Sequence, residues 1–242
     1  MKNKYSTYIF YYTQLTETEQ RVYRQLLMGL EAHVVKCTID AVCDAKQIEK
    51  ILDCIRFENP IISYYNTYTM HIFNNMVCAV QFEYYLSQDK QREINTAMLE
   101  QASRIAAYAK SKGPNTREQV KAVHEYLVQW DYDRDFKPYS FSPAGALLYG
   151  KTVCMGVALA FKLVLDMLDI PSICVRGEHD GEGHAWSQVY YENAWHFFDI
   201  TFDMCSTRGR KISYRSFEKS EIPKKYKAWD AFLLPKTSRK DG

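Results

Sequence analysis

The sequence predicts an α+β fold, with helices and an antiparallel sheet formed by separate stretches of the chain. In some stretches apolar residues recur at three- and four-residue spacing behind helix-capping residues, which is the pattern of amphipathic helices. In others, β-branched and aromatic residues form consecutive short runs separated by turn residues, which is typical of antiparallel strands. At 242 residues and 47% hydrophobic, the chain can bury a large core, as one domain or as a domain with an N-terminal layer.

The first 112 residues contain elements that predict packing and no clustered chemistry. Thr16 and Glu19 form a capping box, in which each side chain bonds the other residue's backbone N–H at a helix start. Asn74-Asn75 suits the two-residue turn of a hairpin. The expected elements are helices at 16–30, 44–59 and 88–110, and hairpin strands at 68–73 and 76–84.

The second half begins after Gly113-Pro114 and holds the residues with reactive side chains. The expected elements are a helix from Asn115 or Thr116 to 130, a loop over 131–143, a helix over 154–168, and strands at 172–176, 184–191 and 194–201. The loop is aromatic, and we interpret it as the wall of a cleft. We therefore divide the chain into a helical and hairpin region, residues 1–112, and a second domain, residues 113–242. Aromatic residues in the tail predict that it packs back onto the body.

Cys154 stands at the start of an expected helix. The free N–H groups and the dipole of a helix start stabilise a thiolate, and a nearby imidazolium does so more strongly. Gly156 leaves the first turn uncrowded, and Gly150 lets the backbone turn into it. This position therefore favours a nucleophilic thiol.

His184 and Asp199 lie on consecutive expected strands, and the turn between those strands decides whether they share a face. A two-residue turn at Glu192-Asn193 pairs Tyr191 with Ala194, and this register puts His184 and Asp199 on the same face, about 7–8 Å apart as diagonal neighbours. A three-residue loop would reverse the parity. The geometry supports a Cys-His-Asp site on the condition that the turn has two residues.

Each of these residues has a structural explanation when taken alone. A cysteine at a helix start is often a small buried hydrophobe, a strand histidine is often a hydrogen-bonded structural group, and an aspartate can simply end a strand. All three together favour catalysis by Cys154 as nucleophile, His184 as base and Asp199 as the acid that orients the imidazole. His196 alternates to the other face, His124 and His71 show no partner, and a metal pair of His179 with His184 is disfavoured.

Composition argues against several other classes of protein. The net charge of +2 gives no reason to expect nucleic acid or a membrane as partner. The seven cysteines include no Cys-x-x-Cys pair, so no structural zinc or other metal is expected. The apolar run at 8–12 is too short for a signal peptide core, and no stretch approaches the ~20 apolar residues of a membrane span. These observations predict a cytoplasmic location.

Three motifs follow one another in the second half: Gly150-Lys151-Thr152-Val153-Cys154, His184-Ala185-Trp186, and Asp199-Ile200-Thr201-Phe202-Asp203. In this order and at these spacings they resemble the transglutaminase-like superfamily of cysteine enzymes. The resemblance covers residues 142–203 well, and residues 124–128 and 132–133 look like the lead-in of bacterial members. It implies a papain-like core, in which the nucleophile helix packs on an antiparallel sheet, with residues 1–112 as an extension. It also implies the same three roles for Cys154, His184 and Asp199.

The family contains transglutaminases, peptidases, amide hydrolases and members without catalysis. Met155 stands where many relatives have Gln, and Ser187 where many have Asn; both departures bear on the substrate and leave the triad intact. An oxyanion donor is expected besides the Cys154 backbone N–H. Candidates for it are Gln129, Tyr132 and Tyr149.

The sequence thus predicts a cysteine enzyme that cleaves peptide or side-chain amide bonds of a protein or peptide substrate through a thioester, without a cofactor. Water as acceptor gives a peptidase or deamidase, and an amine gives cross-linking. The lack of a calcium-ligand acidic cluster favours hydrolysis. The alternative is a catalytically silent scaffold that binds a peptide or protein partner; a redox or metal protein would need partnered cysteines. The oligomeric state does not follow from the sequence.

Overall fold

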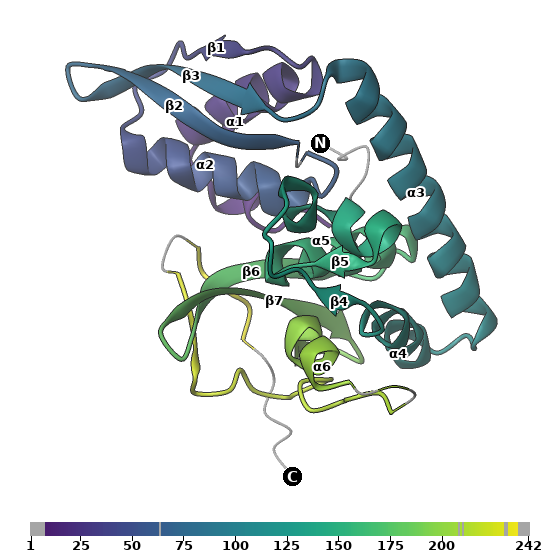
Figure 1. The fold of residues 1–242 in the computed structure, drawn as a ribbon. Helices are drawn as coiled ribbons and strands as arrows, with labels where there is room; N and C mark the ends of the chain where they lie inside the picture. The colour runs from purple at the N-terminus through teal and green to yellow at the C-terminus, as the bar shows by residue number, and fades with distance from the viewer. Residues whose placement is uncertain (1–7, 63, 208, 210, 230–231, 237–242) are drawn as a thin grey trace.

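The N-terminal part of the chain forms a small antiparallel sheet with two helices against it. The computed structural model describes residues 8–62, 64–207, 209, 211–229 and 232–236. The sheet has the strand order β1-β3-β2, and α1 and α2 lie along it (Figure 1). The elements are η1 (Tyr12–Gln14), α1 (Glu17–Glu31), β1 (Lys36–Thr38), α2 (Ala45–Glu58), β2 (Tyr65–Phe73) and β3 (Met76–Tyr84).

Local sequence signals set the ends of these elements as predicted. Thr16 caps α1, with its side chain accepting from the Glu19 N–H while Glu19 accepts from the Thr16 N–H at 2.8 Å. Asp44 caps α2 in a second capping box. Asn74 and Asn75 both have positive φ angles, 47° and 63°, which is the conformation of a tight hairpin turn. The predicted helix-and-hairpin extension is therefore present.

Helix α3 (Gln88–Ser111) runs down one side of the molecule and joins the N-terminal part to the C-terminal part (Figure 1). There, a four-stranded antiparallel sheet has the order β8-β7-β6-β9. The remaining elements are α4 (Thr116–Leu127), β4 (Asp131–Tyr132), η2 (Pro138–Phe141), η3 (Gly145–Tyr149), β5 (Lys151–Thr152), α5 (Cys154–Met167), β6 (Ser172–His179), β7 (Glu182–Tyr191), β8 (Ala194–Phe198), α6 (Ile200–Ser206) and β9 (Tyr226–Ala228). This is the α+β, papain-like arrangement predicted from the sequence, with a helix that begins at Cys154 packed on an antiparallel sheet.

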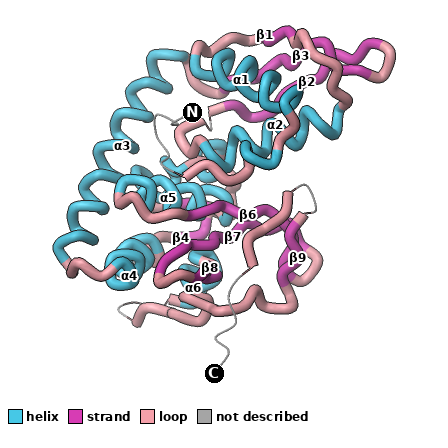
Figure 2. The backbone as a smooth tube through the Cα atoms, turned by 180° about the vertical axis from the view of Figure 1, so that it is seen from behind, coloured by secondary structure: helices cyan, strands magenta, loops and turns pink. Residues whose placement is uncertain are grey.

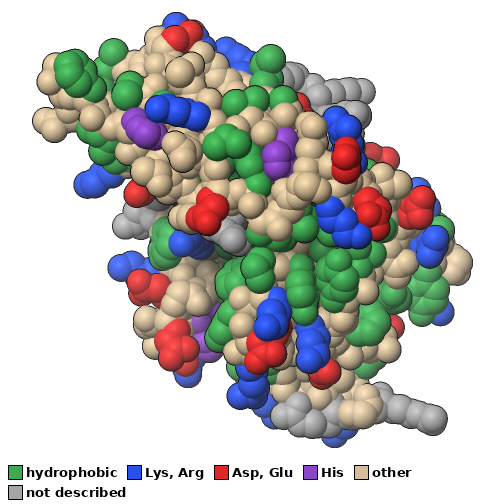
Figure 3. Space-filling view, turned by 45° about the horizontal axis from the view of Figure 1, so that its top comes forward, with side chains coloured by type: hydrophobic (Ala, Val, Ile, Leu, Met, Phe, Trp, Pro, Cys, Tyr) green, Lys and Arg blue, Asp and Glu red, His purple; other side chains and the backbone are tan. Residues whose placement is uncertain are grey.

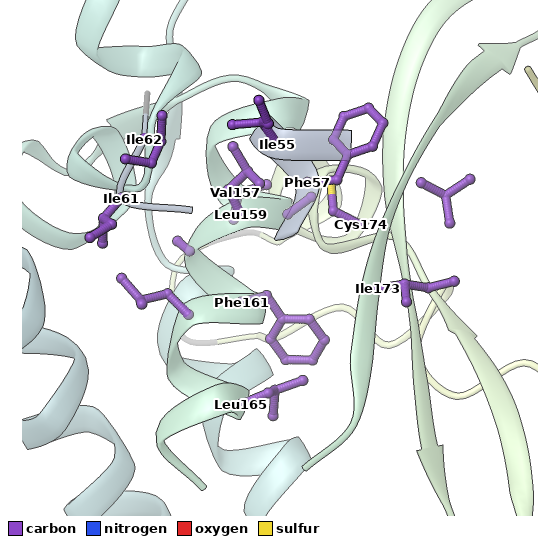
Figure 4. Packing of buried hydrophobic residues seen from close by; sticks show 14 of the residues in the cluster. Ile55, Phe57, Ile61, Ile62, Val157, Leu159, Phe161, Leu165, Ile173 and Cys174 are labelled. Atoms are coloured by element: carbon purple, nitrogen blue, oxygen red, sulfur yellow. The ribbon is translucent and has the colours of Figure 1, made fainter. Parts of the chain in front are cut away.

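Helix α5 is buried on almost every side because α3, α4 and the C-terminal sheet pack against it. In Figure 4, Phe161 and Leu165 of α5 point towards Ile173 of β6, and Ile55 of α2 lies beside the same helix. A helix with this many apolar side chains has to be enclosed, and its two buried charged residues, Lys162 and Asp166, pair with each other at 3.1 Å. One hydrophobic cluster therefore includes side chains from both parts of the chain.

The hairpin β7–β8 has the predicted two-residue turn. Glu192 and Asn193 have positive φ angles, and Tyr191 pairs with Ala194. The prediction that this second strand reaches residue 201 is wrong, because β8 (Ala194–Phe198) stops at Phe198. Asp199 caps α6 instead, with its Oδ1 accepting from the Phe202 N–H at 2.9 Å.

The stretch 131–143, expected to be a loop, contains two short elements. Strand β4 pairs in parallel with β5, with Tyr132 opposite Thr152, and η2 follows. The buried Asp133 carboxylate holds the segment together by accepting from the Ser140 hydroxyl and from two backbone N–H groups. The wall before Cys154 is therefore a braced structure.

The tail returns to the sheet as predicted, and it also forms an unpredicted edge strand. In β9, Tyr226 pairs with His179 of β6; Figure 2 shows this strand at the side of the sheet. Among the residues that the structure describes, no helix has both the length and the apolar character that crossing a membrane requires. On the face drawn in Figure 3, acidic and basic side chains are interspersed.

Candidate active site

Cys154 is the first residue of α5 and is partly exposed to solvent. Gly150, with a φ of 64°, ends the preceding turn, and β5 then leads directly into the helix. The first turn of α5 lies tightly against residues 140–142: a Cβ at Gly156 would collide with the Ser140 carbonyl oxygen and would come within 2.9 Å of the Ser142 carbonyl oxygen. Glycine at position 156 is therefore required by close backbone packing, and this packing fixes where the thiol lies.

His184 projects from β7, where it is paired with Gly177 of β6. Its Nε2 lies 2.8 Å from Oδ2 of Asp199. The Asp199 side chain is 1% exposed and the His184 side chain 16% exposed. Because a carboxylate only accepts hydrogen bonds, Nε2 carries the proton in this contact.

The other ring nitrogen of His184, Nδ1, is the one left to face Cys154, with which the ring also forms a hydrogen bond. Burial lowers the pKa of His184, but the hydrogen bonds and charges of Asp199 and Cys154 outweigh it and raise the pKa to about 10. The imidazole is therefore held as an imidazolium at neutral pH. An imidazolium beside a thiol at a helix start stabilises the thiolate form of that thiol.

Cys174 lies behind this site, on β6, with its Sγ 3.9 Å from Sδ of Met155. Burial, followed by the charge of Cys154, raises the pKa of Cys174 to about 12. This neighbouring thiol therefore stays protonated at neutral pH, and a buried thiol of this kind is inert.

Of the other histidines, His124 departs from expectation. The sequence pattern gave it no partner, yet its ring is fully buried and its Nε2 lies 3.0 Å from Oδ2 of Asp203 on α6. His196 lies away from the site as expected, within 3.3 Å of the Tyr191 carbonyl oxygen. His179 lies beside His184, with ring centroids 5.7 Å apart. Within the described part of the chain, no group of three or more His, Cys, Asp or Glu side chains is arranged to hold a metal ion.

Among the three oxyanion candidates, Tyr132 lies on β4 opposite Thr152 of β5, the strand that leads into Cys154. Burial raises the pKa of Tyr132, and Cys154 is the next contributor. Gln129 instead donates to the Glu125 carbonyl oxygen at 2.7 Å, and the Tyr149 ring lies tilted against that of Tyr139, with centroids 4.5 Å apart. Tyr132 also lines an open pocket of about 700 Å³, formed by residues 128–135 together with Lys151, Met204, Cys205, Thr207 and Gly209.

Sequence reasoning missed Tyr226, whose hydroxyl donates to Oδ2 of Asp199 at 2.6 Å. Its ring centroid lies 6.0 Å from that of His184. The tail was expected to pack on the body, but nothing in its sequence singled out one aromatic residue. The signal was only that several aromatics occur in an otherwise polar stretch.

Residues 91–200 match the family model of the transglutaminase-like superfamily, which supports the resemblance that the three sequence motifs carry. Among solved structures it is similar to a TGase, with 17% identity and a TM-score of 0.43, covering 77% of this chain and 57% of that one. It is also similar to a putative cysteine protease from Cytophaga hutchinsonii, with 14% identity and a TM-score of 0.39, covering 63% and 65%. A third is the periplasmic domain of TgpA from Pseudomonas aeruginosa bound to ethylmercury, with 14% identity and a TM-score of 0.36, covering 53% and 58%.

The chain thus spans less than two thirds of the length of each of these structures. Comparison with curated proteins gave no match.

Proposed function

We propose that this protein is a cysteine enzyme that acts on peptide or side-chain amide bonds through a thioester on Cys154. The observation that carries the proposal is the position of His184, whose ring bonds Cys154 on one side and Asp199, at 2.8 Å, on the other. A nucleophile, a base and an orienting acid in contact form the arrangement that acyl transfer needs.

The proposed first step uses the thiolate and the imidazolium. The Cys154 sulfur attacks the amide carbon, and the carbonyl oxygen becomes an oxyanion. The backbone N–H of Cys154 and the Tyr132 hydroxyl are the donors we assign to that oxyanion. His184 then gives its Nδ1 proton to the departing nitrogen as the C–N bond breaks, which leaves a thioester and a neutral imidazole.

In the second step, neutral His184 takes a proton from the acceptor as the acceptor attacks the thioester. Water as acceptor gives hydrolysis, and a primary amine gives transfer; both return the thiolate and the imidazolium. We propose hydrolysis of a protein or peptide substrate. Asp199 keeps its charge throughout, and its contribution is to orient the ring and stabilise the imidazolium.

We further propose that residues 1–112 brace the catalytic part rather than take part in the chemistry. Tyr11 donates its hydroxyl to the Cys174 carbonyl oxygen at 2.7 Å, and Asp53 of α2 lies 3.1 Å from Arg176 of β6. Both contacts hold the strand that runs behind Cys154. The free thiols of all seven cysteines are compatible with the reducing cytoplasm that we propose as the location.

The test is the rate of alkylation by iodoacetamide at each cysteine, followed against pH by peptide mass spectrometry. An ordinary thiol ionises near about pH 8.5, so rapid alkylation of Cys154 below pH 7 indicates the thiolate–imidazolium pair. Cys78, which is exposed on β3, serves as the reference in the same molecule. We expect His184→Ala to abolish the rapid reaction and His71→Ala, at a partly exposed histidine on β2, to leave it unchanged.

If Cys154 is alkylated as slowly as Cys78 and His184→Ala does not change its rate, the proposal is wrong. The alternative hypothesis, a catalytically silent scaffold that binds a peptide, then replaces it. If the rapid reaction is present, glutamine-containing peptides are incubated with and without a primary amine. Release of ammonia or cleavage without amine incorporation supports hydrolysis; preferred incorporation of the amine contradicts it.

A further inference from the structure

The C-terminal strand β9 supplies a side chain to the His184–Asp199 pair. The Tyr226 hydroxyl donates to Oδ2 of Asp199 at 2.6 Å, and Nε2 of His184 lies 2.8 Å from the same oxygen. One carboxylate oxygen therefore accepts two hydrogen bonds, one from the ring that faces Cys154 and one from the tail of the chain.

We propose that Tyr226 is a positioning residue for the reaction at Cys154: its hydroxyl fixes the Asp199 carboxylate, and its ring covers the His184–Asp199 contact. The inference rests on the proposed function and adds to it a residue that acts through Asp199 and His184, not on the substrate.

The Asp199 carboxylate has little freedom once all its partners are counted. Its Oδ1 accepts from the Phe202 N–H at 2.9 Å, which ties it to the first turn of α6. Its Oδ2 accepts from His184 and Tyr226, which approach from β7 and β9. Rotation of the carboxylate would break all three bonds in a site where the side chain is 1% exposed, and unpaired buried acceptors are costly. Without the Tyr226 donor, only one bond remains on Oδ2.

The ring of Tyr226 is packed among aromatic side chains and is itself held in place. Its centroid lies 4.4 Å from that of His179 and 4.8 Å from that of Phe197. It meets Trp186 edge-on, with centroids 5.3 Å apart and planes at 77°. These contacts put the hydroxyl in one position and cover one side of the His184 ring.

The register of β9 depends on Gly177 of β6, which is also the residue paired with His184. A Cβ at this position would collide with the Lys227 carbonyl oxygen and with the Trp186 ring. The absence of a side chain therefore lets β9 approach β6 closely enough for Tyr226 to reach Asp199.

Ser216 connects the same groups from the other side. Its side chain hydrogen-bonds the Tyr226 hydroxyl, and its carbonyl oxygen accepts from the Asp199 N–H at 3.1 Å. The Tyr226 hydroxyl can therefore accept a hydrogen bond from the Ser216 side chain while it donates its own proton to Asp199.

The test uses Tyr226→Phe, which keeps the ring and removes only the hydroxyl, with iodoacetamide as the probe. We expect alkylation of Cys154 at pH 6 to slow by about tenfold or more, since a hydrogen bond to a charged group is lost. The acid limb of the pH profile should move towards that of an ordinary thiol. Tyr191→Phe is the matched control, because Tyr191 also donates to a carboxylate, Glu218, at 2.8 Å, from the far end of β7.

A double-mutant cycle separates positioning from folding. In the Asp199→Ala background, Tyr226→Phe should have no further effect on alkylation, because the hydroxyl acts only through Asp199. Additive effects of the two substitutions would overturn the inference, as would an unchanged or faster rate in Tyr226→Phe alone. Thermal melting of every variant at pH 6 checks that the fold is present.

The alkylation rates distinguish an error in the proposed function from an error in the role proposed for Tyr226. If wild-type Cys154 shows no rapid alkylation below pH 7, the proposed chemistry is wrong and the inference falls with it. If wild-type Cys154 reacts rapidly and Tyr226→Phe reacts equally fast, the chemistry stands and the positioning role alone is wrong.

Discussion

Replacement of Asp199 by Asn removes the negative charge beside His184 while keeping a side chain that can cap α6. The rise of the His184 pKa from 6.5 to about 10 corresponds to about 5 kcal/mol of preferential stabilisation of the imidazolium. Burial opposes the rise, and Asp199 and Cys154 share it. A hydrogen bond to a charged group contributes about 1.5–3 kcal/mol, so we expect Asp199→Asn to lower the pKa of His184 to between about 8 and 9.

The pKa can be measured by NMR, and its consequence by urea unfolding at pH 6 and at pH 10. Because the folded-state pKa of His184 is raised, its protonation stabilises the folded protein. This contribution is fully present below about pH 6.5 and is lost as the pH rises to about 10. The free energy of unfolding of wild type should therefore exceed that of Asp199→Asn by about 1.5–3 kcal/mol at pH 6. The difference should shrink at pH 10.

A difference in stability that is equal at the two pH values would refute this reasoning, since it would show that Asp199 acts on the fold without reference to the charge of His184. Titration of wild-type His184 near 6.5 would refute it as well. Asp180→Asn is the control: this carboxylate lies 3.8 Å from His179 and pairs with Lys225 at 2.8 Å. It should leave the titration of His184 unchanged.

Three further substitutions test the scaffold around the site. Gly156→Ala should lower the free energy of unfolding by about 1–3 kcal/mol, measured by thermal melting, because the new Cβ collides with the Ser140 carbonyl oxygen. It should also slow alkylation of Cys154 by moving the first turn of α5. A stable variant with unchanged alkylation contradicts this prediction. His124→Phe keeps an aromatic ring but removes a donor to buried Asp203, so urea unfolding should show a loss of about 2–3 kcal/mol. Thr16→Ala should cost about 1 kcal/mol in the same assay through loss of the helix cap, with alkylation unaffected.

The features that could be predicted from sequence are those decided within a few residues. Thr16 and Asp44 each cap a helix with a partner three residues later, and Glu192-Asn193 turns the chain with both φ angles positive. The turn fixes the register of β7 against β8, and Asp199, which directly follows β8, comes to lie beside His184 of β7. His184 and Asp199 could therefore be predicted from the sequence as neighbours, although their role in catalysis stays a prediction.

The end of β8 was mispredicted because two local signals compete there. Phe197, Phe198, Ile200 and Thr201 are residues that favour strands, and they predicted a strand through 201. Asp199 is also a strong helix cap, and in the structure this preference wins, since its Oδ1 bonds the Phe202 N–H. Contact with His184 and Tyr226 adds to the preference through tertiary structure, which the local pattern does not contain.

The contacts that could not be predicted join residues far apart in the chain. Tyr226 bonds Asp199 across 27 positions, and His124 bonds Asp203 across 79. Neither separation has a periodicity that a single sequence can reveal. Both depend on how β9 and α4 pack against elements whose own positions are set by the whole fold.

The two aspartates of the Asp-x-Thr-x-Asp motif divide their contacts between the site and the scaffold. Asp199 faces the site, whereas Asp203, one turn further along α6, accepts from His124 at 3.0 Å and from the Ser216 N–H at 3.0 Å. Ser216 also accepts from the Asp199 N–H. Helix α6 is thus held at its second aspartate by α4 and by the tail, and this anchoring sets the position of the first. The spacing of four residues puts both on a short helix whose placement aims Asp199 at His184. A substitution at His124 should therefore affect the orientation of the imidazole as well as stability.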